Sequence, residues 1–179
     1  PEIGVAATKT FTSQLMVLAQ LACVLGEKRG KMGHTESEEF RHRLHQTPDI
    51  VEQVTAKQEM KIADLAKKFA SARLMVFLGR GINSATAMEA RLKLLEIAYV
   101  PSVAYSAGES KHGPISLIEP GVPVVFVVPK DAARKMILGN IMEMKARGAT
   151  ILSVLDENDK EVKELSDEFI EIPSGVHPL

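Results

Sequence analysis

Short apolar stretches alternate with longer amphipathic ones through the second half of the chain. The apolar stretches predict five strands, at residues 74–78, 100–105, 122–128, 150–155 and 168–172. Helices are predicted between them, at residues 85–97, 131–147 and 160–167. Because apolar strands separated by helices form a parallel sheet covered on both faces, we expect a doubly wound α/β domain preceded by helices. The first of these helices should bury Met88, Leu92 and Leu95.

The first half of the chain is predicted to be helical. Residues 8–27 carry apolar side chains around most of the helix, so this helix should be buried on most sides, against a partner chain or against more of its own domain. Residues 34–72 are strongly charged, and Pro48 is expected to break them into separate helices, including 49–57 and 59–69. We interpret residues 34–72 as a helical connector to the α/β domain.

Composition excludes several classes of function. A formal net charge of −1 without a dense basic run argues against a nucleic-acid partner. Cys23 is the only cysteine, which rules out an internal disulfide and zinc sites built on several cysteines, and we expect it in the core. The longest apolar run is too short to span a bilayer, and no signal peptide is visible, so we expect a cytoplasmic protein with no membrane partner.

Two histidines lie in the charged connector. His42 and His45 are three residues apart, a spacing that is compatible with metal binding. No acidic residue is placed to complete such a site, so we expect a solvated helix face instead.

The candidate chemistry lies between Gly79 and Pro114. A glycine turn at residues 79–84 follows the first predicted strand, but Ser84 stands where a dinucleotide fingerprint has its third glycine. The turn is therefore either a binding site for phosphate or sugar hydroxyls, or only a tight strand-to-helix connection. Because this turn and the loop at residues 106–114 both follow strands, we expect them at the carboxyl edge of the sheet, where such folds bind ligands.

A row of charged residues follows in the predicted helix. Glu89, Lys93 and Glu96 lie on one helix face, and they form either a solvated salt-bridge stripe or a partly buried acid–base group. The apolar residues after Glu96 favour partial burial, which would raise its pKa while Lys93 lowers it.

The loop after the second predicted strand carries His112, between Lys111 and Gly113-Pro114. The histidine is either without a role or a proton-transfer group held rigidly by Gly113 and Pro114. Lys111 and Glu109 are expected only to shape the loop.

Four segments resemble the glutamine–fructose-6-phosphate aminotransferase family, which makes glucosamine 6-phosphate. FLGRG (77–81), MEARLKLLEIAYV (88–100) and AYSAGESKHGP (104–114) are similar to its second sugar-isomerase (SIS) lobe. EIGVAATKTFT (2–12) is similar to the signature helix that ends its first SIS lobe. The resemblance implies a flavodoxin-like three-layer sandwich. It divides the chain into the end of a truncated first lobe (1–33), the connector (34–72) and a second lobe lacking its C-terminal tail (73–179).

The family's functional residues map onto six positions of this sequence. Glu96 matches the carboxylate that moves a proton between C1 and C2 of the sugar, and Lys93 matches the lysine beside the sugar. His112 matches the ring-opening histidine, which the family donates from a neighbouring subunit. The implied substrate contacts are made by Val5, Ala7 and Thr8. The resemblance implies a sugar-phosphate ligand, a homodimer with shared active sites and no metal or organic cofactor.

Some family features have no counterpart in these residues. They are the glutaminase domain, the phosphate loop of the first lobe and the C-terminal lysine, so we expect the chain alone to be inactive. Leu95 also replaces a lysine common beside the catalytic glutamate, and Arg91 replaces a small residue. A sugar-phosphate isomerase or deaminase of the same superfamily, and a non-catalytic sugar-phosphate sensor, remain as alternatives. A nucleotide-binding protein is a third, and we expect no binding of NAD or ATP.

Overall fold

The computed structural model describes residues 4–174 and divides the chain into two compact units between Ala56 and Lys57. The first unit holds helix α1 (Lys9–Lys28) and the first part of helix α2 (His34–Phe69). Glu27 near the end of α1 accepts hydrogen bonds from two side chains of α2, Ser37 Oγ at 2.5 Å and Arg41 Nη2 at 2.6 Å. These bonds lower the pKa of Glu27, with Ser37 the larger cause.

Cys23 and the apolar surface of α1 test two of the sequence predictions. Cys23 is 1% exposed, which confirms it as a core residue. The burial expected for the rest of α1 is not met within the part of the chain that the structure describes. Its exposed apolar side chains are Leu15, Val17, Leu18, Leu21, Val24 and Leu25. That this surface packs on a partner chain or on more of its own domain stays a prediction.

Pro48 does not break α2, so the prediction of separate helices here is wrong. The helix runs without interruption from His34 to Phe69 with Pro48 inside it. Proline removes one backbone donor and crowds the preceding turn, but it leaves the remaining helical bonds intact. In a 36-residue helix those bonds, together with local ion pairs such as Arg43–Glu39, maintain the helix past one proline.

The second unit is built on a parallel five-stranded sheet, as the sequence predicts. Its strand order is β2-β1-β3-β4-β5, and every neighbouring pair is parallel. The strands are β1 (Met75–Gly79), β2 (Ser102–Ser106), β3 (Pro123–Val128), β4 (Thr150–Asp156) and β5 (Glu168–Ile172). The register places Gly79 beside Ser106, so the turn after β1 and the loop after β2 lie at the same carboxyl edge, as expected.

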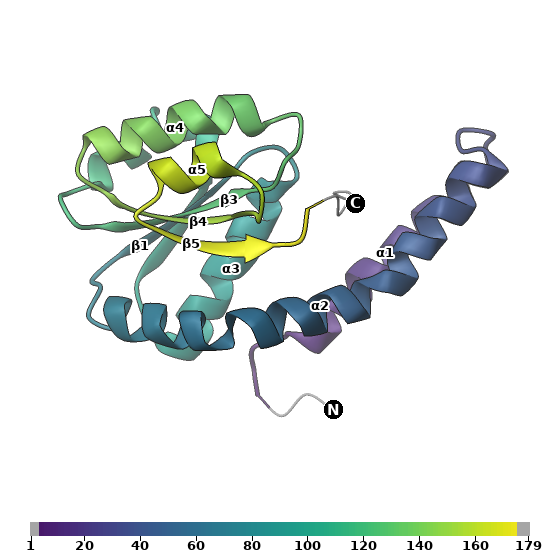
Figure 1. Ribbon diagram of the computed structural model, residues 1–179, viewed down its shortest axis with the longest axis horizontal. Coiled ribbons are helices and arrows are strands. Elements are labelled where there is room, and N and C mark those ends of the chain that lie inside the picture. The colour runs from purple at the N-terminus through teal and green to yellow at the C-terminus, as the bar shows by residue number, and fades with distance from the viewer. Residues whose placement is uncertain (1–3, 175–179) are drawn as a thin grey trace. The chain divides into compact units, whose positions relative to one another are not determined.

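Helices cover both faces of the sheet, which makes three layers (Figure 1). Helix α3 (Asn83–Ala98) lies on one face, and α4 (Arg134–Ala146) and α5 (Lys160–Leu165) lie on the other. Alternate strand residues feed the two cores. Phe77 and Val125 pack with Leu65 and Ala87 on the α3 side, whereas Leu78, Phe126, Ile137, Ile141, Met144 and Val162 pack on the α4–α5 side.

The buried face of α3 differs from the predicted one. Met88 is 52% exposed, and Leu92 and Leu95 are only half-buried. The residues against the sheet are instead Asn83, Ala87, Ala90 and Leu94. Ala87 is completely buried, because a small side chain lets the helix axis approach the sheet closely. The prediction weighted large apolar residues and missed this small-residue contact.

Among residues 4–174, no helix combines the length and apolar character needed to cross a membrane.

Gly79 joins the sheet to α3 through a close backbone contact. A Cβ atom at this position would lie 2.0 Å from the carbonyl oxygen of Asn83 and 2.4 Å from its carbonyl carbon. Both atoms are backbone, so no side-chain rotation can relieve the overlap.

We therefore predict that Gly79→Ala lowers the free energy of unfolding by about 3 kcal/mol. The matched control is Gly139→Ala in α4, where no neighbouring atom lies within 4 Å of the new Cβ. That change should be neutral or should stabilise by up to about 1 kcal/mol, because alanine favours a helix interior over glycine. Urea unfolding monitored by circular dichroism measures both, and equal midpoints for the two variants would contradict the prediction.

Candidate functional site

The charged row of α3 is a three-residue ion-pair cluster. Lys93 Nζ lies 2.9 Å from Glu96 Oε2 and 3.2 Å from Glu89 Oε1. The side chains of Lys93, Glu89 and Glu96 are 21%, 23% and 28% exposed, so the cluster is partly buried, not a fully solvated stripe. The hydrogen bond to Glu96 is the largest cause of a raised pKa for Lys93, and Glu89 adds to it. Lys93 therefore stays protonated well above neutral pH.

The partial burial of Glu96 does not come from the apolar residues that follow it. Ile97 is 60% exposed and Tyr99 is 84% exposed. Met88, Leu92 and Glu96 instead follow one another at four-residue intervals along the surface of α3. Glu96 therefore continues a surface row made by the exposed Met88 and the half-buried Leu92.

The glycine turn at the carboxyl edge uses its polar groups internally. The backbone N–H groups of Asn83, Ser84 and Ala85 donate to carbonyl oxygens of the turn itself. Ser84 Oγ donates to the Gly79 carbonyl at 3.0 Å. The crevice between this turn and the loop after β3 leaves no room for a water molecule. Of the two interpretations of the turn, these bonds favour the tight structural connection over an anion site.

The second polar link of this turn reaches the loop after β3. Asn83 Nδ2 donates to Asp131 Oδ2 at 2.9 Å, and the same carboxylate accepts from the backbone of Ala133. The side chain of Asn83 is thus also committed to holding two loops together.

The His112 loop lies between two short 3-10 helices, η1 (Ala107–Glu109) and η2 (Pro114–Leu117). The N–H of His112 donates to the Glu109 carbonyl at 3.0 Å, and Ile115 N–H donates to Ser110 at 2.8 Å. Gly113 has φ of +128°, which favours glycine. The exposed imidazole borders an open hollow of about 570 Å³, lined also by Tyr105, Glu109, Pro114, Ser116 and Leu117. The imidazole is therefore available to a ligand or to another subunit.

The structure does not bring His112 and Glu96 together. Helix α3 begins at the carboxyl edge of the sheet, beside Gly79, and ends beside the first residue of β2 at the amino edge. Arg91, in the middle of α3, donates from its Nε to the Ser102 carbonyl at 3.1 Å. Glu96 lies about 20 Å along the helix from its first residue, at 1.5 Å per residue. The segment that carries His112 packs through Ala107, Ile115 and Ile118 in the core on the α4 side, so Glu96 and His112 belong to segments on opposite faces of the sheet.

The remaining predicted site residues belong to the first unit. Val5 is 95% exposed, Ala7 is half-buried, and Thr8 precedes the first turn of α1 without a capping bond from its side chain. Glu2 and Ile3 of the same motif lie outside the described residues. The roles of Val5, Ala7 and Thr8 stay predictions.

His42 and His45 are both exposed on α2, as expected for a solvated face. The ring of His42 lies 3.1 Å from the amide nitrogen of Gln46. Within residues 4–174, no group of three or more potential metal ligands comes together.

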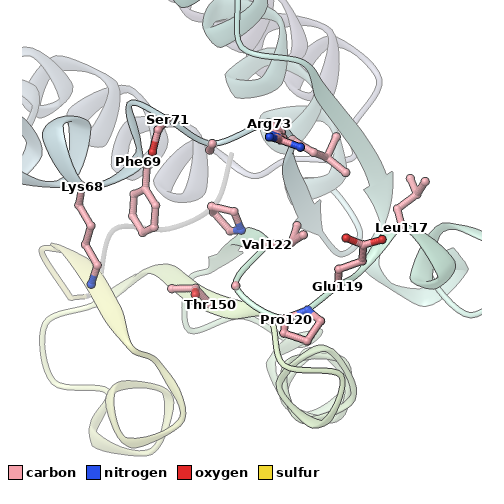
Figure 2. Close-up of a pocket in the computed structure, with 13 residues that line it drawn as sticks. Lys68, Phe69, Ser71, Arg73, Leu117, Glu119, Pro120, Val122 and Thr150 are labelled. Carbon is pink, nitrogen blue, oxygen red and sulfur yellow. The ribbon is translucent and has the colours of Figure 1, made fainter.

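Sequence reasoning missed a hollow of about 550 Å³ at the amino edge of the sheet (Figure 2). Its walls come from the segments that lead into β1, β3 and β4, and they include Arg73, Glu119 and Thr150. No motif marks these residues, and none of the site residues predicted from the sequence lines this hollow.

The described geometry defines a doubly wound α/β domain. The SIS domain family matches residues 68–179, and the chain belongs to this family.

Curated relatives and solved structures agree with the family match. The chain is 41% identical over 179 residues to the isomerizing glutamine–fructose-6-phosphate aminotransferase of Thermus thermophilus, covering all of this chain and 29% of that protein. It is 42% identical over 178 residues to the Mycobacterium tuberculosis enzyme of the same name, covering 97% and 28%. The C-terminal domain of glucosamine-fructose-6-phosphate aminotransferase from Francisella tularensis superposes with a TM-score of 0.89 at 34% identity, over 97% of this chain and 49% of that one. The chain thus spans less than a third of the curated relatives' length.

The two carboxylates beside Lys93 differ in their effect on its pKa. We predict that Glu96→Gln lowers the pKa of Lys93 more than the matched change Glu89→Gln, because the bond to Glu96 is the larger cause of the raised value. NMR titration of the Lys93 side chain, labelled at Cε, measures both shifts. An equal shift, or a larger one for Glu89→Gln, would show that the distances of the two ion pairs do not determine the pKa of Lys93.

Proposed function

We propose that this chain supplies the isomerase part of a glutamine–fructose-6-phosphate aminotransferase, which makes glucosamine 6-phosphate from fructose 6-phosphate and ammonia. The single observation that carries the proposal is the partly buried Lys93–Glu96 pair on a chain that is 41% identical, over its whole length, to enzymes of that name. In this proposal, residues 1–33 end a first SIS lobe, 34–72 connect the lobes and 73–179 form the second lobe.

The charge of the α3 cluster suits a base. Lys93 contributes one positive charge against two carboxylates, so the cluster keeps one negative charge in excess. The raised pKa of Lys93 keeps that lysine from acting as a base at neutral pH. Glu96 is the carboxylate we assign to removing the C1 proton of the open-chain imine and returning it at C2. Lys93 then orients Glu96 and offers a positive charge to oxygen atoms of the sugar.

His112 is assigned to the earlier step, the opening of the sugar ring. An imidazole can remove the proton of the anomeric hydroxyl and protonate the ring oxygen. Its position on the face of the sheet opposite α3 supports a site assembled from two subunits, with His112 of one subunit meeting Glu96 of the other. Val5, Ala7 and Thr8 are assigned to substrate contacts on the first-lobe side. Neither step requires a metal or an organic cofactor.

The base assignment is tested in the full-length protein with Glu96→Gln and the matched Glu89→Gln. We expect Glu96→Gln to lower kcat for glucosamine 6-phosphate formation by at least about 100-fold, the usual contribution of a general base. Binding of fructose 6-phosphate, measured by calorimetry, should change little, and Glu89→Gln should retain most activity.

Each alternative has its own outcome in the same assays. Near-normal turnover by Glu96→Gln would show that the base is another residue. Sugar-phosphate binding without any turnover by the unaltered protein would identify a sensor, and conversion without ammonia would identify an isomerase.

The shared site predicts a homodimer, and it predicts complementation between inactive subunits. Glu96→Gln and His112→Ala subunits, mixed and allowed to exchange, should recover about a quarter of the normal activity, since half of the twofold dimers then hold one intact site. Sedimentation velocity at micromolar concentration measures the dimer directly. A monomer, or no recovery after verified exchange, would contradict the shared site.

A further inference from the structure

The His112 loop is tied to α4 by an ion pair next to the histidine. Lys111 Nζ lies 2.7 Å from Glu143 Oε1, and Glu143 belongs to the last turn of α4. The sequence suggested only that Lys111 shapes its own loop. The ion pair instead connects that loop to a helix on the face of the sheet opposite α3.

A second link joins the other side of the loop to the turn after β1. The guanidinium of Arg80 lies against Gly108, since a Cβ at Gly108 would come within 3.0 Å of Arg80 Nη1 and 3.4 Å of its Cζ. The same Nη1 donates to Asn140 Oδ1 at 3.4 Å. Asn140 is only 6% exposed, so the acceptor of this bond is fixed within the body of α4.

Glu143 joins these two links into one network. Its Oε2 accepts from Asn140 Nδ2 at 3.3 Å, while its Oε1 pairs with Lys111. These contacts therefore form a continuous network, Arg80–Asn140–Glu143–Lys111. It runs from the turn after β1, through α4, to the residue before His112. It contacts the loop at Gly108 and at Lys111, four and one residues before the histidine.

We propose that this network acts by positioning His112: it fixes the orientation in which the His112 side chain projects from the subunit surface. The positioning residues are Arg80, Asn140, Glu143 and Lys111. This inference rests on the proposed function, because it assigns the network to delivery of His112 to a neighbouring site. The apolar residues Ala107, Ile115 and Ile118 already anchor the loop in the core. The polar network therefore fixes the orientation of the loop residues between these anchors.

The expected effects on stability and on rate distinguish a positioning role from a role in overall stability. Lys111 is 60% exposed, and an exposed ion pair contributes about 1 kcal/mol or less to stability. A displacement of a catalytic group by about 1 Å, in contrast, can lower a rate by up to about 100-fold. Loss of the network should therefore leave the fold stable and change the loop and the reaction.

Hydrogen exchange with mass spectrometry tests the structural half in the full-length protein. The amides of Ser110, His112 and Ile115 donate within the loop and report its opening. We expect Arg80→Ala and Glu143→Ala to speed their exchange by about 10-fold, while the unfolding midpoint moves little. The control is Lys145→Ala, which removes an ion pair of the same helix with Asp167 and leaves the His112 loop untouched.

Steady-state kinetics tests the catalytic half. Arg80→Ala and Glu143→Ala should lower kcat by about 10-fold with little change in KM, and Lys145→Ala should change neither. The charge-swapped pair Lys111→Glu with Glu143→Lys should recover both slow exchange and kcat relative to either single change.

The outcomes distinguish this inference from the proposed function. If Arg80→Ala and Glu143→Ala exchange at the wild-type rate, the network does not hold the loop, whatever the activity. If exchange is faster but kcat is unchanged, the network does not position His112 for catalysis. If Glu96→Gln has already shown the base to be wrong, the exchange data still decide whether the network holds the loop.

Discussion

The direction of α3 relative to the sheet is the constraint on which the arrangement of functional groups depends. Parallel strands need a crossover that returns the chain to the edge where the first strand began. Helix α3 makes that return between β1 and β2, so its first residue and its last residue lie at opposite edges. The close contact of Gly79 with Asn83 fixes the start, and the buried Ala87 sets the helix close to the strands. The end of α3 is thereby separated from the turn after β1.

The two groups of charged residues differ in composition. On α3, one lysine meets two carboxylates, which leaves one negative charge in excess. Beside the His112 loop, the cations Arg80 and Lys111 are linked through Asn140 and Glu143, and Glu109 adds a second carboxylate next to the histidine. The cations and carboxylates around the loop therefore balance, whereas the α3 cluster stays acidic.

Local patterns predicted much of this structure, because they express interactions between residues near in sequence. The five strands, their parallel pairing and the contact of Glu89, Lys93 and Glu96 all follow from spacing. What the sequence left undetermined depends on distant partners. The Arg80–Asn140 bond joins residues 60 positions apart, and no composition rule marks it. The buried face of α3 was predicted wrongly because Ala87, a small residue, makes the contact with the sheet. The helix break at Pro48 was predicted wrongly because the long helix around the proline retains its other hydrogen bonds. The glycine turn gave a motif-like signal, yet its backbone donors are used within the turn.

These observations together describe where the fold places the residues that the proposed function uses. A doubly wound domain has a ready ligand position at the carboxyl edge, but here the turn after β1 and the loop after β3 are closed by Ser84, Asn83 and Asp131 bonding to their own neighbourhood. The groups that remain available for chemistry are those on the periphery: Glu96 at the far end of α3 and His112 on its loop. Glu96 is half-buried and His112 is exposed, so both side chains are accessible at the surface. In the proposed function a second subunit covers them and excludes water, which the interior of this fold does not do for either group.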